Sequence, residues 1–165
     1  GAVPEAVEGM AVMQRACVSA EFRAFANRKG PNQASPVTRW LRLLARHAHS
    51  GVWSLLGGGI EPGEEPTDAV AREVLEETGA RLRITGLIGA YGGDPMAVTY
   101  PNGDQVGYVT VAYECELLSD PAPDMDEIVE LGWFPREAIA ALPRRDWIDR
   151  VIRDAPHRAR GDAAR

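Results

Sequence analysis

The stretch GGGIEPGEEPTDAVAREVLEETGA, residues 57–80, constrains the fold most, because it fixes where one helix starts and stops. Pro66 suits the first turn of a helix, and Asp68 is stabilised near the positive end of the helix dipole. Gly79 is a natural stop just past the end. The pattern therefore predicts a helix from Pro66 to Thr78, entered through a glycine-rich loop.

This helix carries two kinds of face. Its apolar face, which we expect to pack on a sheet, consists of Val70, Ala71, Val74 and Leu75. Glu73, Glu76 and Glu77 stand at i, i+3 and i+4, so we expect them to share another face. They lie in the last turns, where the helix dipole disfavours anions by roughly 0.3–1 kcal/mol each. Local rules broken without local compensation are typical of a functional site.

A divalent cation would compensate the three carboxylates directly. Carboxylates are hard oxygen ligands that suit Mg²⁺ or Mn²⁺, and the absence of His or Cys among them disfavours zinc. A Mg²⁺ site of this kind leaves positions for substrate phosphates. The three glycines at 57–59 are expected to let the backbone approach the metal and the phosphates closely. The alternative interpretation of the glutamates is a solvated acidic helix face.

The rest of the chain predicts an α/β fold in a single domain. Alternating or short apolar runs predict strands at 16–25, 39–46 (with a helix as the alternative), 52–56, 81–92, 106–115 and 128–134, with a hairpin turn at 101–104 and further helices at 135–142 and 144–154. We expect residues 1–10 to be a loose lead-in, residues 11–154 to form the domain and residues 155–165 to be a disordered tail. Residues 26–38 are predicted to form a loop.

The net charge and composition of the chain disfavour some classes of binding partner. The net charge of −6 disfavours a nucleic-acid or anionic-membrane surface, since both need a basic face. Cys17 and Cys115 lie in apolar runs and are expected to be buried, reduced thiols. No apolar run reaches the length of a membrane span and no signal peptide is visible, so a cytoplasmic location is the default expectation. A homodimer is compatible with the sequence.

The segment resembles the Nudix box, G-x5-E-x7-R-E-U-x-E-E-x-G-U, where U is a bulky apolar residue. The matching residues are Gly58, Glu64, Arg72, Glu73, Val74, Glu76, Glu77 and Gly79, while Ala80 stands at the last U position. The resemblance implies a Nudix-type α/β/α sandwich with a mixed β-sheet. It also implies Mg²⁺- or Mn²⁺-dependent hydrolysis of a nucleoside diphosphate linked to another moiety, with a small-molecule nucleotide as the substrate.

The resemblance also implies roles for the acidic residues. Glu73 and Glu77 would be the principal metal ligands, and Glu76 with the Gly57 carbonyl would complete the set. Glu73 is also a candidate for the base that deprotonates the attacking water. The second candidate is Glu127, which lies six residues before Trp133, where members of the family often place an extra acidic residue.

Two further residues of the box are expected to act indirectly. Arg72 is expected to orient neighbouring glutamates rather than to touch the substrate. Glu64 is expected either to bind a second metal or to pair with Arg72.

Three residues are candidates for binding the substrate. Arg46 ends the strand at 39–46 before the glycine segment and could meet a phosphate, although an exposed arginine without a ligand is the preferred interpretation. Gly58 would let the backbone approach a phosphate. Tyr91 could stack on a base, although packing in the core is the alternative that its surroundings favour.

Four functions remain to be compared. The first is a hydrolase of a nucleotide sugar or of ADP-ribose. The second is a pyrophosphatase that clears non-canonical nucleoside triphosphates. The third, a nucleotide-sensing module without turnover, is disfavoured because every carboxylate of the box is present. The fourth is a structural acidic domain, which would not bind Mg²⁺.

Overall fold

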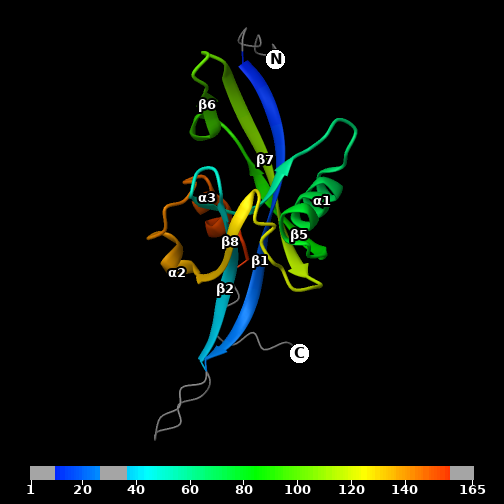
Figure 1. Cartoon of the computed structure of the whole chain (residues 1–165), viewed down its shortest axis with the longest axis vertical. Helices are drawn as coiled ribbons and strands as arrows, with labels where there is room; N and C mark the ends of the chain where they lie inside the picture. The colour runs from blue at the N-terminus through cyan, green and yellow to red at the C-terminus, as the bar shows by residue number, and fades with distance from the viewer. Residues whose placement is uncertain (1–9, 27–36, 157–165) are drawn as a thin grey trace, which may run out of the picture.

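The computed structural model describes residues 10–26 and 37–156. The predicted loop at 26–38, the predicted lead-in at 1–10 and the predicted tail at 155–165 lie almost wholly outside the described residues. The fold is α/β with one mixed sheet, as predicted. Helix α1 (Pro66–Thr78) lies on one side of the sheet, and helices α2 (Arg136–Ile139) and α3 (Ile148–Asp154) lie on the other (Figure 1).

The described residues form an eight-stranded sheet. Its strands are β1 (Met10–Ala26), β2 (Val37–His47), β3 (Trp53–Ser54), β4 (Leu56–Gly59), β5 (Leu82–Tyr91), β6 (Ala97–Thr99), β7 (Gln105–Leu117) and β8 (Ile128–Pro135). A short 3₁₀ helix, η1 (Asp94–Met96), precedes β6. Within the described residues no helix is long and apolar enough to cross a membrane.

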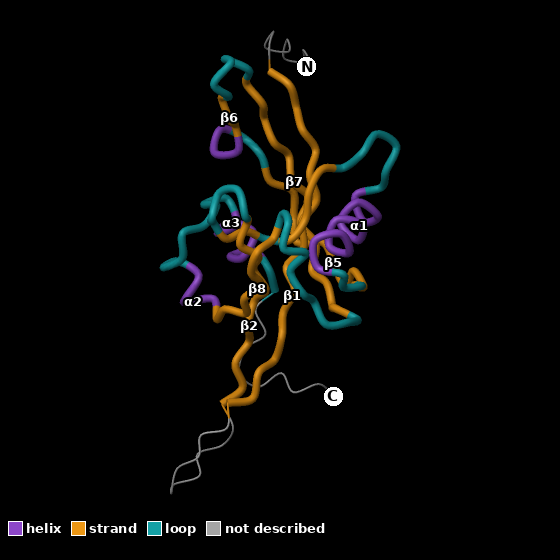
Figure 2. The backbone as a smooth tube through the Cα atoms, in the orientation of Figure 1, coloured by secondary structure: helices purple, strands orange, loops and turns teal. Residues whose placement is uncertain are grey.

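Strand β1 runs through the middle of the sheet (Figure 2). Its first part pairs in parallel with β7, from Met10 opposite Gln105 to Ala20 opposite Cys115. Its last part pairs antiparallel with β2, and β4 pairs antiparallel with its middle. Because β5 also pairs with β7, the order along the main path is β3-β2-β1-β7-β5. The parallel contact between β1 and β7 makes the sheet mixed.

Two apolar cores fill the two faces of the sheet. The core under α1 contains Ala16, Val18, Leu43, Ala45, Leu56, Val70, Val74, Cys115 and Ile128. The core under α2 and α3 contains Cys17, Leu44, Trp53, Leu55, Tyr91, Met96, Ala112, Ile139, Ile148, Val151 and Ile152. Cys17 and Cys115 are therefore buried on opposite faces, and both thiols are free, as predicted.

Helix α1 has the predicted bounds, but its buried face differs from the prediction. Gly79 caps the helix in the left-handed conformation (φ 69°), and its N–H donates to the Leu75 carbonyl. The Leu75 side chain, predicted to be packed, is 51% exposed, whereas Glu77 is 2% exposed. Residues 70, 74 and 77 form one stripe at i, i+4 and i+7 spacing, so turning this stripe inward buries Glu77 and leaves Leu75 outside.

Two other predicted elements need correction. The glycines at 57–59 are not a loop, because they belong to strand β4 and pair with β1. The helix predicted at 144–154 begins only at Ile148. Before it, the backbone of Arg144 forms a bridge with Trp53, and the Arg145 N–H donates to the Trp53 carbonyl (3.0 Å). This pairing holds the segment extended and prevents an earlier start of the helix.

Candidate active site

Two glycines let strand β4 lie close to its neighbours, one toward strand β1 and the other toward helix α1. Gly57 has φ 147°, and a Cβ placed on it would overlap the Ala16 carbonyl on β1. A Cβ on Gly58 would overlap the Glu73 carboxyl group of α1. Glycine at position 58 therefore lets the acidic face of the helix approach β4, and glycine at position 57 lets β4 approach the backbone of β1.

Glu77 is the carboxylate buried most deeply at this contact. The Gly57 N–H lies 3.4 Å from Glu77 Oε2 and is a weak donor to it. Burial raises the pKa of Glu77 to about 8, and the nearby carboxylates of Glu73 and Glu127 add to the shift. Burial also raises the pKa of Glu73, against the opposing effect of Arg72. For both carboxyl groups, burial is the largest cause of the shift, and it disfavours the charged form.

Arg72 binds the other acidic residues of the segment. Its guanidinium donates to both oxygens of Glu64 (Nε to Oε1 2.8 Å, Nη2 to Oε2 3.0 Å), and this bidentate pair lowers the pKa of Glu64 to about 2. Nη1 donates to Glu73 Oε1 (3.0 Å) and, more weakly, to Glu76 Oε2 (3.4 Å). Nη2 also donates to the Gly59 carbonyl (3.0 Å). Arg72 thus fixes Glu73 on the helix side of the site.

A cavity of about 750 Å³ opens beside these carboxylates. It is lined by Gly57, Gly58, Gly59, Glu73, Glu77 and Glu127, together with Arg15, His47, Ser54, Pro95, Met96, Val98, Tyr100, Tyr108, Arg145, Asp146 and Trp147. The glycine strand, the two helix glutamates and Glu127 therefore share one cavity, although Glu127 comes from the segment before β8. The volume is in the usual range for a small-molecule site.

Several predicted site residues lie elsewhere. Glu64 and Arg72 form their ion pair beside the cavity lining, and the Glu76 side chain is 59% exposed. Glu73, Glu76 and Glu77 thus do not share one face, because Glu73 and Glu77 turn toward the sheet and Glu76 turns to solvent. Arg46 is also outside the cavity lining and donates through Nε to Glu130 Oε2 (2.8 Å).

Tyr91 is placed in the core rather than on the cavity wall. It is 5% exposed, and its hydroxyl donates to Asp154 Oδ2 on α3 (2.9 Å). The Arg150 guanidinium covers its ring at 5.3 Å. These contacts tie β5 to α3, which is the packing role that the sequence analysis weighed against stacking on a base.

Most of the remaining cavity residues were not predicted as site residues from the sequence. Among them are Arg15, Tyr108, Arg145 and Trp147, which carry a charge or an aromatic ring. Arg15 lies on β1, Tyr108 lies on β7 two residues before the register partner of Arg15, and Arg145 and Trp147 precede α3. Each has an ordinary local sequence context, so no spacing pattern marks them. They meet only because β1 and β7 pair in parallel and the segment before α3 folds back onto β3.

The carboxylates suit a hard divalent cation in their chemistry. Within the described residues Glu77 is a buried carboxylate with one weak donor, and Glu73 stands beside it, so a cation between them would relieve the cost of their charges. In residues 10–26 and 37–156, however, no three His, Cys, Asp or Glu side chains converge closely enough to hold an ion. Glu76 and Glu64 are held away by Arg72, which accounts for this arrangement.

Comparisons with known proteins converge on one family. The family model described as the NUDIX domain matches residues 35–155. A nucleoside triphosphatase, NudI, of Enterobacter sp. is 33% identical over 100 residues, which cover 59% of this chain and 71% of the relative. A MutT-like protein of Streptomyces ambofaciens is 53% identical over 100 residues, 60% of this chain and 58% of the relative.

The fold has a match among solved structures as well. The crystal structure of a MutT NUDIX hydrolase from Burkholderia pseudomallei superposes with a TM-score of 0.65 at 20% identity, covering 88% of this chain and 98% of that one. At this identity the likeness concerns the fold alone. The chain spans little more than half the length of the Streptomyces relative (58%), so the matched part is the domain that the two share.

Proposed function

The chain belongs to the Nudix hydrolase family, and from that premise we propose that it cleaves a phosphoanhydride bond of a nucleotide with Mg²⁺ or Mn²⁺ bound at Glu73 and Glu77. The observation that carries the proposal is the buried Glu77 beside Glu73, facing a strand of glycines at the wall of a substrate-sized cavity. A buried carboxylate with a raised pKa is costly to keep, and such groups cluster at functional sites.

Glu73 and Glu77 would hold the cation as its principal ligands, with the Gly57 carbonyl beside them. Glu76 would complete the set only after leaving Arg72, because its side chain turns to solvent in this structure. Such a cation supplies charge neutralisation at the phosphates and lowers the pKa of a bound water. Gly57 and Gly58 keep the wall free of side chains, so that a pyrophosphate group can lie against β4. Arg72 positions Glu73 through its hydrogen bond of 3.0 Å.

Glu127 is our first candidate for the general base. It lies on the cavity wall with Glu73 and Glu77 but on a different segment, and its side chain is exposed. Its backbone is fixed, because the Ala48 N–H donates to the Glu127 carbonyl (2.9 Å). A carboxylate that is solvated and forms no ion pair within the described residues is suited to accept a proton from water. Glu73 is the second candidate.

The substrate is a nucleoside diphosphate derivative, such as a nucleotide sugar or ADP-ribose, in the first form of the proposal. The second form is a nucleoside triphosphate pyrophosphatase, and the similarity to NudI favours it, since that relative is named a nucleoside triphosphatase. Both forms use the same carboxylates and differ only in the groups attached to the pyrophosphate.

The test is hydrolysis of a panel with Mg²⁺ or Mn²⁺, containing nucleotide sugars, ADP-ribose, dinucleoside polyphosphates and (d)NTPs, by the wild type and by Glu77→Gln. Titration of Mn²⁺, followed by its electron paramagnetic resonance signal, measures cation binding independently. We expect hydrolysis of one substrate class and tight Mn²⁺ binding, both lost in the variant. Cation and nucleotide binding without turnover would overturn the hydrolase proposal in favour of a sensing module.

A further inference from the structure

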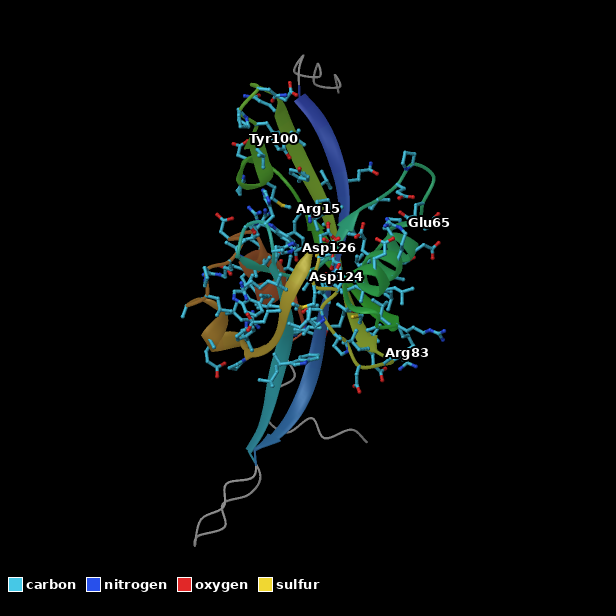
Figure 3. The ribbon with its side chains drawn as sticks, viewed as in Figure 1. Arg15, Glu65, Arg83, Tyr100, Asp124 and Asp126 are labelled. Carbon is cyan, nitrogen blue, oxygen red and sulfur yellow. The ribbon has the colours of Figure 1, made fainter. Side chains whose placement is uncertain are left out.

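The cavity has a cationic and aromatic wall in addition to its carboxylates. This wall consists of Arg15 on β1, Tyr100 and Tyr108 on the β6–β7 hairpin, and Arg145 and Trp147 before α3. Figure 3 shows Arg15 near the centre of the molecule and Tyr100 further along the hairpin. None of these residues belongs to the glycine–glutamate segment, so their role needs a separate explanation.

Arg15 is held in place by its aromatic neighbours. Its guanidinium lies over the Tyr108 ring, 5.6 Å from the ring centre. The Tyr108 hydroxyl is itself hydrogen bonded to the Tyr100 hydroxyl (2.7 Å), which fixes the ring from its other end. Stacking on an aromatic face leaves the edge N–H donors of a guanidinium available. Arg15 is therefore a pre-oriented donor on the cavity wall.

Arg145 approaches the same part of the cavity from another element. Its backbone N–H donates to the Trp53 carbonyl (3.0 Å), which anchors the segment while the side chain stays exposed at the cavity. The electrostatic effects of both arginines meet at His47, another residue of the cavity wall. Burial, Arg15 and Arg145 all lower the pKa of His47, while Glu127 opposes them. The positive charges of Arg15 and Arg145 therefore both reach the part of the cavity beside His47.

The arginines of the cavity differ from most others in their partners. Six arginines of the described residues form an ion pair with a carboxylate: Arg42, Arg46, Arg72, Arg83, Arg144 and Arg153. In the same residues neither Arg15 nor Arg145 has such a pair, although Asp146 also lines the cavity. Two guanidinium groups without carboxylate partners, in a cavity of an acidic protein, are suited to bind an anion from solution.

We propose that Arg15 and Arg145 together bind the terminal phosphate of the substrate, and so select nucleoside triphosphates over nucleotide sugars with an uncharged sugar. The inference rests on the proposed hydrolysis at Glu73 and Glu77, which serves either substrate class. A triphosphate carries an additional phosphate dianion that a nucleotide sugar lacks, and planar guanidinium groups match phosphate oxygens in pairs. Arg15 lies on β1, before residue 35, where the family match begins, so the family match does not cover this residue.

The test compares Arg15→Gln, Arg145→Gln and the double variant with Arg81→Gln, an exposed arginine outside the cavity lining. For each protein, kcat/KM is measured on a nucleoside triphosphate and on a nucleotide sugar with Mg²⁺. Each cavity variant is expected to lose about 10-fold or more on the triphosphate, the loss typical of a charge-assisted hydrogen bond, and less than about 3-fold on the nucleotide sugar. Arg81→Gln is expected to change neither. Equal losses on both substrates would overturn the selectivity.

Binding of inorganic tripolyphosphate by calorimetry separates this inference from the proposed hydrolysis. The wild type is expected to bind tripolyphosphate, and each cavity variant is expected to bind it about 10-fold more weakly. This result would support the two arginines even if the wild type hydrolysed no nucleotide, in which case only the proposed hydrolysis fails. Unchanged affinity in both variants would overturn the inference whatever the enzyme hydrolyses. Circular dichroism and thermal melting establish that the variants are folded.

Discussion

Replacing Glu77 with Gln should stabilise the protein in the presence of a chelator while it abolishes cation binding. Glu77 is 2% exposed, and burial raises its pKa to about 8 from an ordinary 4.5. Between these two pH values the folded state keeps a proton that the unfolded state has released. Stability therefore falls as the pH rises through this window. Gln has the shape of the protonated acid and can still accept the Gly57 N–H, but it carries no such penalty.

The size of the stabilisation by Glu77→Gln follows from the pKa shift of Glu77. One pKa unit corresponds to about 1.4 kcal/mol, so at pH 7 the carboxyl group costs up to about 3 kcal/mol, and at pH 5 less than about 1 kcal/mol. For a domain of this length, about 3 kcal/mol corresponds to a rise in Tm of roughly 6–12 °C at pH 7. The gain of Glu77→Gln should thus shrink steadily as the pH is lowered toward 5.

Thermal unfolding with EDTA, followed by circular dichroism at pH 5, 6, 7 and 8, measures this gain. Glu76→Gln is the matched control, because Glu76 lies one position away but is 59% exposed, and we expect a change within about 0.5 kcal/mol. Adding Mg²⁺ in place of EDTA should raise the Tm of the wild type and not that of Glu77→Gln. A Glu77→Gln protein that is no more stable than the wild type at pH 7, or equally stabilised at every pH, would refute the reasoning.

Three further predictions test other contacts. Gly58→Ala should keep the fold but weaken Mn²⁺ binding at least several-fold, because the new Cβ displaces only the flexible Glu73 carboxyl group. Gly57→Ala should instead lower the Tm strongly, because its Cβ meets the β1 backbone at a positive φ. Thermal melting and Mn²⁺ titration of both variants distinguish the two effects. Arg42→Ala removes buried hydrogen bonds to a serine, a glutamate and a backbone carbonyl, so urea denaturation should show a loss of about 3–5 kcal/mol. His47 should titrate below its ordinary pKa of 6.5 in an NMR titration, and a value at or above 6.5 would contradict its burial beside the cavity arginines.

The parts of the fold that were predicted correctly depend on local chemistry. Helix α1 begins at Pro66 and ends before Gly79 because proline and glycine determine helix ends within one turn. Val70 and Val74 are buried as predicted, but Leu75 is exposed and Glu77 is buried instead, since the position of Glu77 depends on the strand that the helix meets. Three glycines have little intrinsic preference for a strand, so the pairing of β4 with β1 decides their conformation.

The residues of the candidate site also fall into those that local sequence rules predict and those that only the tertiary fold brings together. Glu73 and Glu77 stand out because their spacing and their place near the end of a helix break local rules. Arg15 and Tyr108 break none, and they meet only through the pairing of β1 with β7. The neighbours of Arg46 in sequence suggest a phosphate ligand, but the register between β2 and β8 places Glu130 beside it. Side chains that are brought together by distant strands leave no spacing signal in one sequence.

The parallel pairing of β1 with β7 has a consequence for the order of folding. β1 is synthesised before its parallel partner β7, and strands β2 to β6 with helix α1 lie between them in the sequence, since Met10 pairs with Gln105. During translation β1 therefore cannot pair with β7 until the segment from β2 to β6 has been synthesised. Until then its apolar residues are exposed or covered by the pairing with β2. Contacts of this separation slow folding and expose a nascent chain to aggregation. A chaperone that shields β1 on the ribosome should therefore raise the yield of folded protein more than one that acts after release.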